Sequence, residues 1–435
     1  MNTLTFFLVF LVILGVVALL KPTWCLYFYV LLIPGLSLAH VELPILGTLS
    51  GMITLVIVLV LLIHALMRRV KLKVSPITWP FLVFIGANSV AFLRSGQELL
   101  SIILVVYYLV LHLVVYSTIS NEKLAQRLLM LFALVTIVLS ALGISSYLIG
   151  WPPWAMVATF RIPAIGVVKR LQGPAADPNA FAYVFLLGLP FITLQIFSAR
   201  SWARRLIWII GLYIGITGLI LTFSRSAYIG FAVSFIILFW LAERRMKWRY
   251  FTITALIVVA LLIFFPGPWK VWMTKRIASI GQLSGDVARV QQFQGAWLTF
   301  LDHPFFGVGL GRAQEAVLNY IPNAIAPYPH NDILMTSVEM GLLGLVPLFI
   351  IFYRVIAIPL RTAFRTRDEH LRNFLVAVVA AIVGFLVQGL FIFNMNWGVI
   401  WFIMAIGFSM SVSRHTNVSI HGMLKQRQKV DKESN

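Results

Sequence analysis

The stretch "ITLVIVLVLLIHALMRRVKLK" (residues 53–73) decides the fold class, because it joins a long apolar run to a cluster of four basic residues. An apolar helix of about 20 residues crosses a bilayer core about 30 Å thick. Similar runs recur along the 435-residue chain, in which 60% of residues are hydrophobic and 11% are charged. Soluble proteins carry about 25% charged residues. The sequence therefore predicts an all-α polytopic membrane protein, since alternating strand patterns typical of a closed barrel are absent.

The apolar runs give thirteen expected spans. They are 4–20, 23–39, 46–67, 75–93, 98–116, 126–150, 180–198, 206–223, 227–242, 250–266, 332–353, 373–393 and 397–412. The second contains Pro34 and Gly35, so a kinked or re-entrant segment is the alternative, which leaves twelve full spans. The first run lacks a basic segment before it and a small-residue cleavage site after it, so we expect a retained span and not a signal peptide.

The basic residues predict the orientation, because cytoplasmic loops carry an excess of Lys and Arg. With a cytoplasmic C-terminus, most of the 34 Lys and Arg residues fall inside. The net charge of +20 is then a consequence of topology, and we expect no nucleic-acid partner. Three regions follow: an N-terminal transmembrane bundle at 1–150, a catalytic transmembrane region at 151–412 and a basic cytoplasmic tail at 413–435. Two long external loops, 151–179 and 267–331, belong to the second region.

Arg225 lies in "LTFSRSAYIGF" (221–231), where two expected spans meet with almost no loop between them. An arginine between helix ends in a membrane is costly unless it reaches the interface or meets an anion. One interpretation is an interfacial anchor that bonds the last carbonyls of the preceding helix. The other is a guanidinium that makes bidentate contact with phosphate, helped by the positive end of a helix capped by Ser226.

The second external loop contains "SGDVARVQQFQGAWLTFLDHPFFGVGLG" (284–311). Its apolar residues fall at helical spacing, so we expect an amphipathic helix over residues 287–301, lying along the outer surface with Arg289 in its first turns. The stripe consists of Val290, Phe293, Trp297 and Phe300. The glycines that follow at 307, 309 and 311 are interpreted as backbone geometry, since no strand precedes them and no Lys-Ser/Thr follows.

The stretch "PHNDILMTSVEMGLLGL" (329–345) brings titratable residues to the edge of a span. Asn331 or Asp332 is expected to cap the helix, which holds His330 just outside it. A neutral imidazole there suits a general base, and a hydrogen-bonded interfacial histidine is the alternative. Glu339 is expected about 12 Å further along the helix, facing the bundle.

The residues of the chain do not suit a metal site or a proton-coupled transporter. The chain has no Asp-x-Asp pair and few external acids, and its single cysteine, Cys25, excludes an intramolecular disulfide and a cysteine metal site. A proton-coupled transporter needs several acids or histidines within its spans, whereas Glu339 is nearly alone there. We therefore expect no metal and no cofactor.

Four segments resemble the O-antigen ligase and polymerase family, which includes lipid A-core:O-antigen ligases, O-antigen polymerases and related oligosaccharyltransferases. They are "GPAADPNAFAYVF" (173–185), "LTFSRSAYIG" (221–230), "ARVQQFQGAWLTFLDHPFFGVGLG" (288–311) and "PHNDILMTSVEMGLLGL" (329–345). They appear in the family's order across the C-terminal half, whereas the N-terminal half is similar only in hydropathy.

The resemblance implies a GT-C-type glycosyltransferase of the bacterial plasma membrane. Such enzymes take a glycan from an undecaprenyl-diphosphate carrier on the external face and transfer it to a glycan, lipid A-core or protein acceptor, without a metal or a nucleotide sugar. The family pattern makes His330 the candidate base and Arg225 and Arg289 the candidate diphosphate ligands. Glu339 is the second candidate catalytic residue; it orients the site or, as the alternative, only ties helices together. Further donor or acceptor contacts are expected from Arg161, Lys169, Arg170, Asn179 and Asn331.

Direct displacement would invert the anomeric centre. Ligase, polymerase and protein glycosylation remain open, and a flippase for a polyprenyl-linked glycan, without chemistry, is the alternative class.

Overall fold

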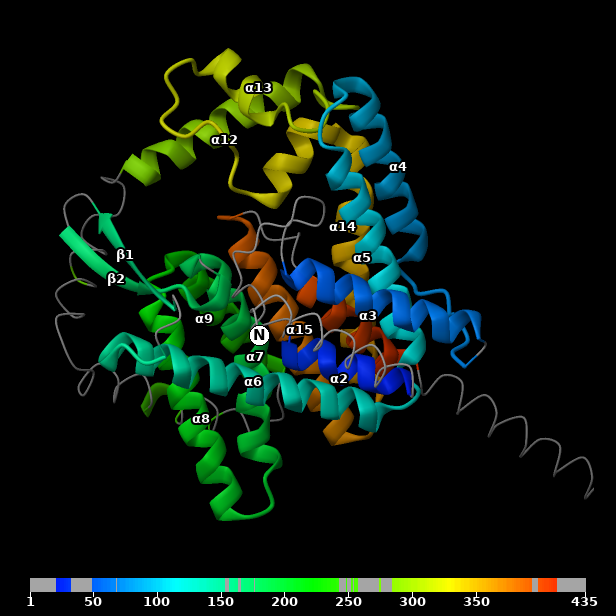
Figure 1. Cartoon of the computed structure of the whole chain (residues 1–435), viewed down its shortest axis with the longest axis vertical. Helices are drawn as coiled ribbons and strands as arrows, with labels where there is room; N and C mark the ends of the chain where they lie inside the picture. The colour runs from blue at the N-terminus through cyan, green and yellow to red at the C-terminus, as the bar shows by residue number, and fades with distance from the viewer. Residues whose placement is uncertain are drawn as a thin grey trace, which may run out of the picture.

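The computed structural model describes residues 21–32, 49–67, 69–152, 156–162, 166–175, 177–241, 284–392 and 398–412, together with residues 248, 252, 254–256 and 274. Its elements are drawn in Figure 1. The helices of the first half are α2 (Pro22–Leu32), α3 (Leu49–Leu66), α4 (Thr78–Ser95), α5 (Leu99–Thr118), α6 (Glu122–Ile149) and α7 (Pro178–Ser198). Those of the second half are α8 (Trp202–Leu221), α9 (Arg225–Leu241), α12 (Ser284–Asp302), α13 (Ala313–Tyr320), α14 (Asp332–Arg365), α15 (Glu369–Gly389) and a C-terminal helix, Gly398–Val412.

The helices confirm the prediction of an all-α polytopic membrane protein. In the described part of the chain, six helices are long and apolar enough to cross a membrane: α5, α6, α7, α8, α14 and α15. Four shorter apolar helices accompany them, over Pro22–Leu32, Leu55–Leu66, Arg225–Leu241 and Gly398–Val412. The six long helices coincide with the expected spans 98–116, 126–150, 180–198, 206–223, 332–353 and 373–393. The expected span 4–20, most of 250–266 and the tail 413–435 lie outside those residues.

Loop 151–179 contains a β-hairpin that the sequence reading missed. Strand β1 (Val157–Ile162) pairs antiparallel with β2 (Gly166–Leu171), with Val157 opposite Leu171 and Ile162 opposite Gly166. A short 3-10 helix, η2 (Gly173–Ala175), leads from the hairpin into α7. The hairpin rests on α6 and α8. A two-stranded hairpin is not a barrel, so it adds a local element to this loop and leaves the all-α prediction for the membrane part unchanged.

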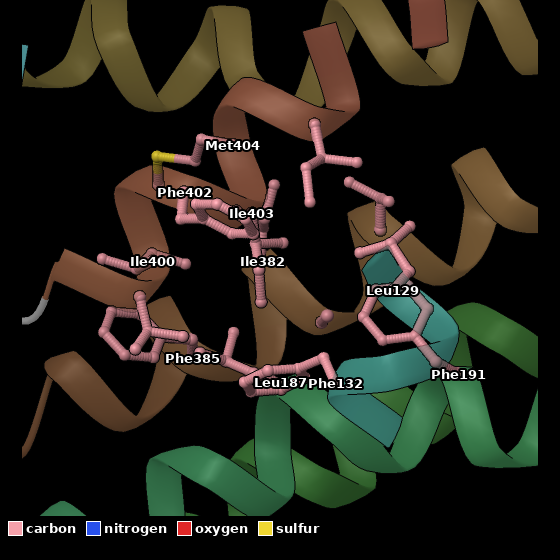
Figure 2. Packing of buried hydrophobic residues seen from close by; sticks show 14 of the residues in the cluster. Leu129, Phe132, Leu187, Phe191, Ile382, Phe385, Ile400, Phe402, Ile403 and Met404 are labelled. Carbon is pink, nitrogen blue, oxygen red and sulfur yellow. The ribbon is translucent and has the colours of Figure 1, made fainter. Parts of the chain in front are cut away.

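The core is built around α7, because 89% of its most apolar 18-residue stretch is buried inside the protein. Helices α6, α8, α9 and α15 pack against it. Figure 2 shows Leu129 of α6, Leu187 of α7, Ile382 of α15 and Ile403 of the C-terminal helix in this cluster. The segment 173–185 that resembled the family thus leads into the most deeply buried helix of the protein.

Helices α12 and α13 lie together at one end of the molecule, over the first part of α14, while α4 and α5 run beside α14 (Figure 1). This end brings together the candidate residues of the second external loop and of α14.

Candidate functional site

His330 is held by the cap of α14. The Asn331 side chain accepts hydrogen bonds from the backbone N–H groups of Ile333 (2.8 Å) and Leu334 (3.0 Å), which makes Asn331 the N-cap. The same side chain donates through Nδ2 to the carbonyl of Leu390 (2.7 Å), just after α15. Of the two caps expected from the sequence, Asn331 fills the role, and Asp332 is the first helical residue. Asn331 therefore fixes the start of α14, and with it His330, to the end of another helix.

Helix α12 supports the loop before His330 through a glutamine pair. Gln292, which is buried, donates through Nε2 to the carbonyl of Ala326 (2.7 Å) and accepts from the His330 N–H (3.4 Å). Its neighbour Gln291 accepts from the N–H of Ile325 (3.0 Å). Sequence reasoning missed this contact, although two adjacent glutamines on an otherwise apolar helix were the available sign of it.

Opposite charges act on the His330 imidazole from two different segments. The side chain is exposed, yet its pKa lies below the ordinary value of 6.5. Partial desolvation is the largest cause, the positive charge of Arg289 is the second, and the negative charge of Asp177 acts in the opposite direction. The Tyr328 ring meets the imidazole edge-on at 5.7 Å between centroids. Desolvation and Arg289 therefore favour the neutral imidazole, and Arg289 and Asp177 both lie within electrostatic reach of it.

Asp177 belongs to the N-terminus of α7, where its carboxylate accepts the Ala180 N–H (2.7 Å) and caps the helix. It was not among the candidate residues. The charges of Asp177, at the N-terminus of α7, and of Arg289, in the first turns of α12, therefore both act on His330 at the start of α14.

Arg170 acts as a brace between the hairpin and the helices. Its Nε donates to the carbonyl of Thr222 (2.8 Å), and its Nη2 donates to the Asn179 side chain (3.2 Å). The Asn179 carbonyl accepts from Gln388 of α15 (2.9 Å). The guanidinium also lies over the Phe160 ring, 5.1 Å from its centroid. Arg170 and Asn179 therefore contact each other, and Arg170 holds the segment that precedes Arg225.

The other two candidates lie at different positions of the hairpin. Lys169 is exposed and lies opposite Thr159, on the strand face away from Arg170. Arg161 lies opposite Val167, near the turn.

Arg225 is the first residue of α9. The preceding residue, Ser224, accepts the Tyr228 N–H through its backbone carbonyl (3.1 Å), which puts Ser224 at the cap position. Ser226 lies inside the first turn, 3.3 Å from Ser224 between hydroxyl oxygens. The expectation that Ser226 caps this helix is therefore wrong, because the helix begins at Arg225, two residues earlier than assumed. Phe223, just before it, has φ 50°, which makes the tight bend between α8 and α9.

Helix α14 is broken at Gly341. The glycine-rich turn at residues 304–311 forms hydrogen bonds with the backbone groups that the break leaves without helical partners. Gly341 has φ 59° and ψ −149° inside the helix. The N–H groups of Val308 and Gly309 donate to the carbonyls of residues 338 and 339 (2.8 and 3.0 Å). In return, the N–H groups of residues 342 and 343 donate to the carbonyls of residues 304 and 305 (2.7 and 3.1 Å). A Cβ atom at Gly307 would stand 2.4 Å from the backbone of α14, so the glycines serve backbone geometry as expected.

Glu339 is buried just before this break. Its Oε1 accepts the N–H of Gly311 (2.9 Å). The side chain lines a cavity of about 490 Å³ that is bounded by α4, α5, α14 and the C-terminal helix. The residues that line this cavity include Tyr328 and Asp332, on either side of His330 in the chain, but not His330 itself. Glu339 therefore belongs to the cavity and not to the group formed by His330, Arg289 and Asp177.

Helix α12 forms as expected, but its large apolar stripe faces outward. Val290, Phe293 and Trp297 are exposed, by 56%, 55% and 49%. The face packed on the protein carries side chains that are either small or polar: Ala288, Gln292, Ala296 and Thr299. Such an exposed apolar face fits the expected position along the membrane surface.

Residues 210–349 match the model of a family described as O-antigen ligase. This range contains Arg225, Arg289, His330 and Glu339, and it ends within α14. The match confirms the family predicted from the sequence. No curated protein matches the chain.

Proposed function

We propose that this polytopic membrane protein, which carries an O-antigen ligase domain at residues 210–349, is a glycosyltransferase that moves a glycan from an undecaprenyl-diphosphate carrier to an acceptor hydroxyl. We further propose that it acts on the external face of the bacterial plasma membrane, in cell-surface polysaccharide synthesis. The observation that carries the proposal is the position of His330 directly before the capped start of α14, where the positive charge of Arg289 acts on its imidazole.

The arginines bind the diphosphate of the donor. A departing diphosphate gathers negative charge, and fixed guanidinium groups outside bulk water stabilise that charge well. Arg289 supplies one such group within reach of His330. Arg225 supplies another at the first residue of α9, where the helix end also favours anions. Arg170 supports this side by holding the Thr222 carbonyl and thus the approach to Arg225.

His330 activates the acceptor hydroxyl. Its neutral imidazole takes the proton of the acceptor hydroxyl as the oxygen attacks the anomeric carbon. The new bond forms between acceptor oxygen and carbon, the bond from carbon to the diphosphate oxygen breaks, and the electron pair leaves with the diphosphate. The imidazolium forms beside Asp177, whose negative charge favours it. One displacement of this kind inverts the anomeric centre.

The test is a transfer assay on the full chain in nanodiscs, with an undecaprenyl-diphosphate-linked oligosaccharide as donor and lipid A-core, a glycan or a glycosylatable protein as acceptors. We expect the carrier to lose its glycan and one acceptor to gain it. His330→Ala should lose this transfer. The matched control is His370→Ala, which should keep it, since His370 is an exposed histidine near the start of α15. Movement of the intact donor across the bilayer without transfer would instead establish a flippase.

The external face has its own test. A reporter fused after residue 310 is expected to lie outside, and one fused after residue 365 in the cytoplasm. Exchanged locations would put His330 on the cytoplasmic side and refute the proposed compartment.

A further inference from the structure

We propose that the cavity between α4, α5 and α14 binds an uncharged sugar ring of the acceptor and presents its hydroxyl toward His330. The assignment to the acceptor rests on the proposed function, whereas the binding of a sugar ring does not.

The cavity has the size of a small-molecule site. Its volume is about 490 Å³, within the range of about 300–1,000 Å³ common for ligand pockets. It lies next to the candidate base, because Tyr328 lines the cavity and also meets the His330 ring at 5.7 Å. Asp332, two residues after His330, lines the cavity as well. The cavity and the imidazole thus share Tyr328 as a neighbour.

The lining has the two kinds of groups that a sugar needs. Carboxylates and amides that accept or donate hydrogen bonds come from Glu98, Glu339, Asp332, Asn88 and Gln314. Aromatic side chains for the apolar faces of a ring come from Phe81, Phe84, Tyr108 and Trp401. Burial and the charges of Glu339 and Glu98 raise the pKa of the Tyr328 phenol, so its hydroxyl keeps its proton and remains a donor.

The charge of the residues that line the cavity suits a neutral acceptor and disfavours the diphosphate donor. All the charged residues that line the cavity are acids: Glu98, Asp332 and Glu339. A diphosphate placed among them would be repelled, whereas neutral hydroxyl groups donate hydrogen bonds to carboxylates. Arg289 acts on His330 without lining this cavity. The imidazole therefore has a basic partner that suits the donor and an acidic cavity nearby that suits a neutral acceptor.

Gly311 holds two of the acids in place. Its N–H donates to Glu339 (2.9 Å), and a Cβ atom on it would stand 2.9 Å from Cγ of Glu98. Glu98 precedes α5 with φ 63°, a left-handed conformation that is unfavourable for a residue with a side chain. It also accepts from the Ser101 hydroxyl (3.3 Å). The two carboxylates thus approach the same point of the backbone from α5 and α14.

The test measures ligand binding to the full chain in nanodiscs, without turnover. Saturation-transfer NMR is recorded with the methyl glycosides of glucose, galactose and N-acetylglucosamine, and phosphorus line broadening with inorganic diphosphate. We expect at least one glycoside to bind the wild type and Ser101→Trp, which fills the cavity, to abolish that binding. Glu98→Gln and Glu339→Gln are expected to weaken it about tenfold or more, because each replaces a carboxyl group that bonds the sugar hydroxyls by an amide. Glu315→Gln, a matched change on the exposed face of α13, should have no effect.

Inorganic diphosphate provides the internal control. Its line broadening should persist in Ser101→Trp and be lost in Arg289→Ala, which also shows that the tryptophan variant is folded. If that variant does not fold, the two glutamine variants decide.

Absence of binding by all three glycosides, or binding that survives these cavity variants unchanged, overturns the inference. Glycoside binding in a protein without transfer activity would refute the proposed function alone. Transfer activity without cavity-dependent glycoside binding would refute the inference alone.

Discussion

The pH dependence of turnover tests the candidate base most directly. A base works only when neutral, so the rate is expected to be constant above the pKa of His330 and to fall below it. Partial desolvation and the charge of Arg289 lower this pKa from 6.5, so the fall begins below that pH. Each further pH unit then reduces the neutral fraction, and with it the rate, about tenfold. Replacement by alanine is expected to reduce turnover roughly 100- to 10,000-fold, the usual contribution of a general base.

The two charges near His330 predict opposite displacements of this profile. Asp177→Asn removes the negative charge but keeps a side chain that can cap α7, so the pKa of His330 falls further and the decline begins at lower pH. Arg289→Ala removes the positive charge, so the pKa rises and the decline begins at higher pH. The assay is the single-turnover rate at saturating donor across about pH 4.5 to 8.5.

Two outcomes would refute this reasoning. The first is an alanine variant at position 330 that turns over within a few-fold of the wild type at every pH. The second is a donor affinity that strengthens as the pH falls and disappears with His330→Ala, which would make His330 a phosphate ligand. Displacements of the wrong sign in the Asp177 and Arg289 variants would show that other groups set the profile.

Three further changes probe the support of the site. Gly307→Ala is expected to lower the free energy of unfolding by about 2–5 kcal/mol, because its Cβ would stand 2.4 Å from the backbone of α14; Gly86→Ala, with nothing within 4 Å, should change thermal unfolding little, and equal effects would contradict the packing argument. Gln292→Leu removes the side-chain partner of the Ala326 carbonyl and the His330 N–H and should cost about 0.5–1.5 kcal/mol for each bond together with most turnover, whereas Gln294→Leu on the exposed side of α12 should be active in the same assays. Arg225→Lys should reduce turnover with normal expression, since a point charge does not reproduce bidentate phosphate contact; full activity would leave Arg225 an interfacial anchor.

The features predictable from the sequence are those that depend on local composition. Apolar runs gave the helices, the cap at Asn331 followed from a polar residue before an apolar run, and the glycines of the turn were recognised as backbone geometry. The hairpin at 157–171 was missed because its strands are short and half-buried and surrounded by Pro and Gly residues that favour a loop interpretation.

The features that escaped prediction depend on partners far apart in the chain. The bonds from Gln292 to Ala326 and from Arg170 to Thr222 join segments 34 and 52 residues apart. No local periodicity records such pairs. For the same reason the sequence did not show that Glu339 contacts Gly311 and lines a cavity together with Tyr328 and Asp332, the residues on either side of His330.

The order of synthesis gives the break in α14 a consequence for biogenesis. The turn at 304–309 leaves the ribosome before residues 338–343, the segment that pairs with it. Until that helix arrives, the N–H and carbonyl groups of the turn must remain hydrated, because lipid offers them no partner. The nascent chain therefore keeps this turn at the water interface while the later helix is delivered. Insertion of the broken helix and completion of the reaction centre become one event, and a chain released from the ribosome before residue 343 lacks both.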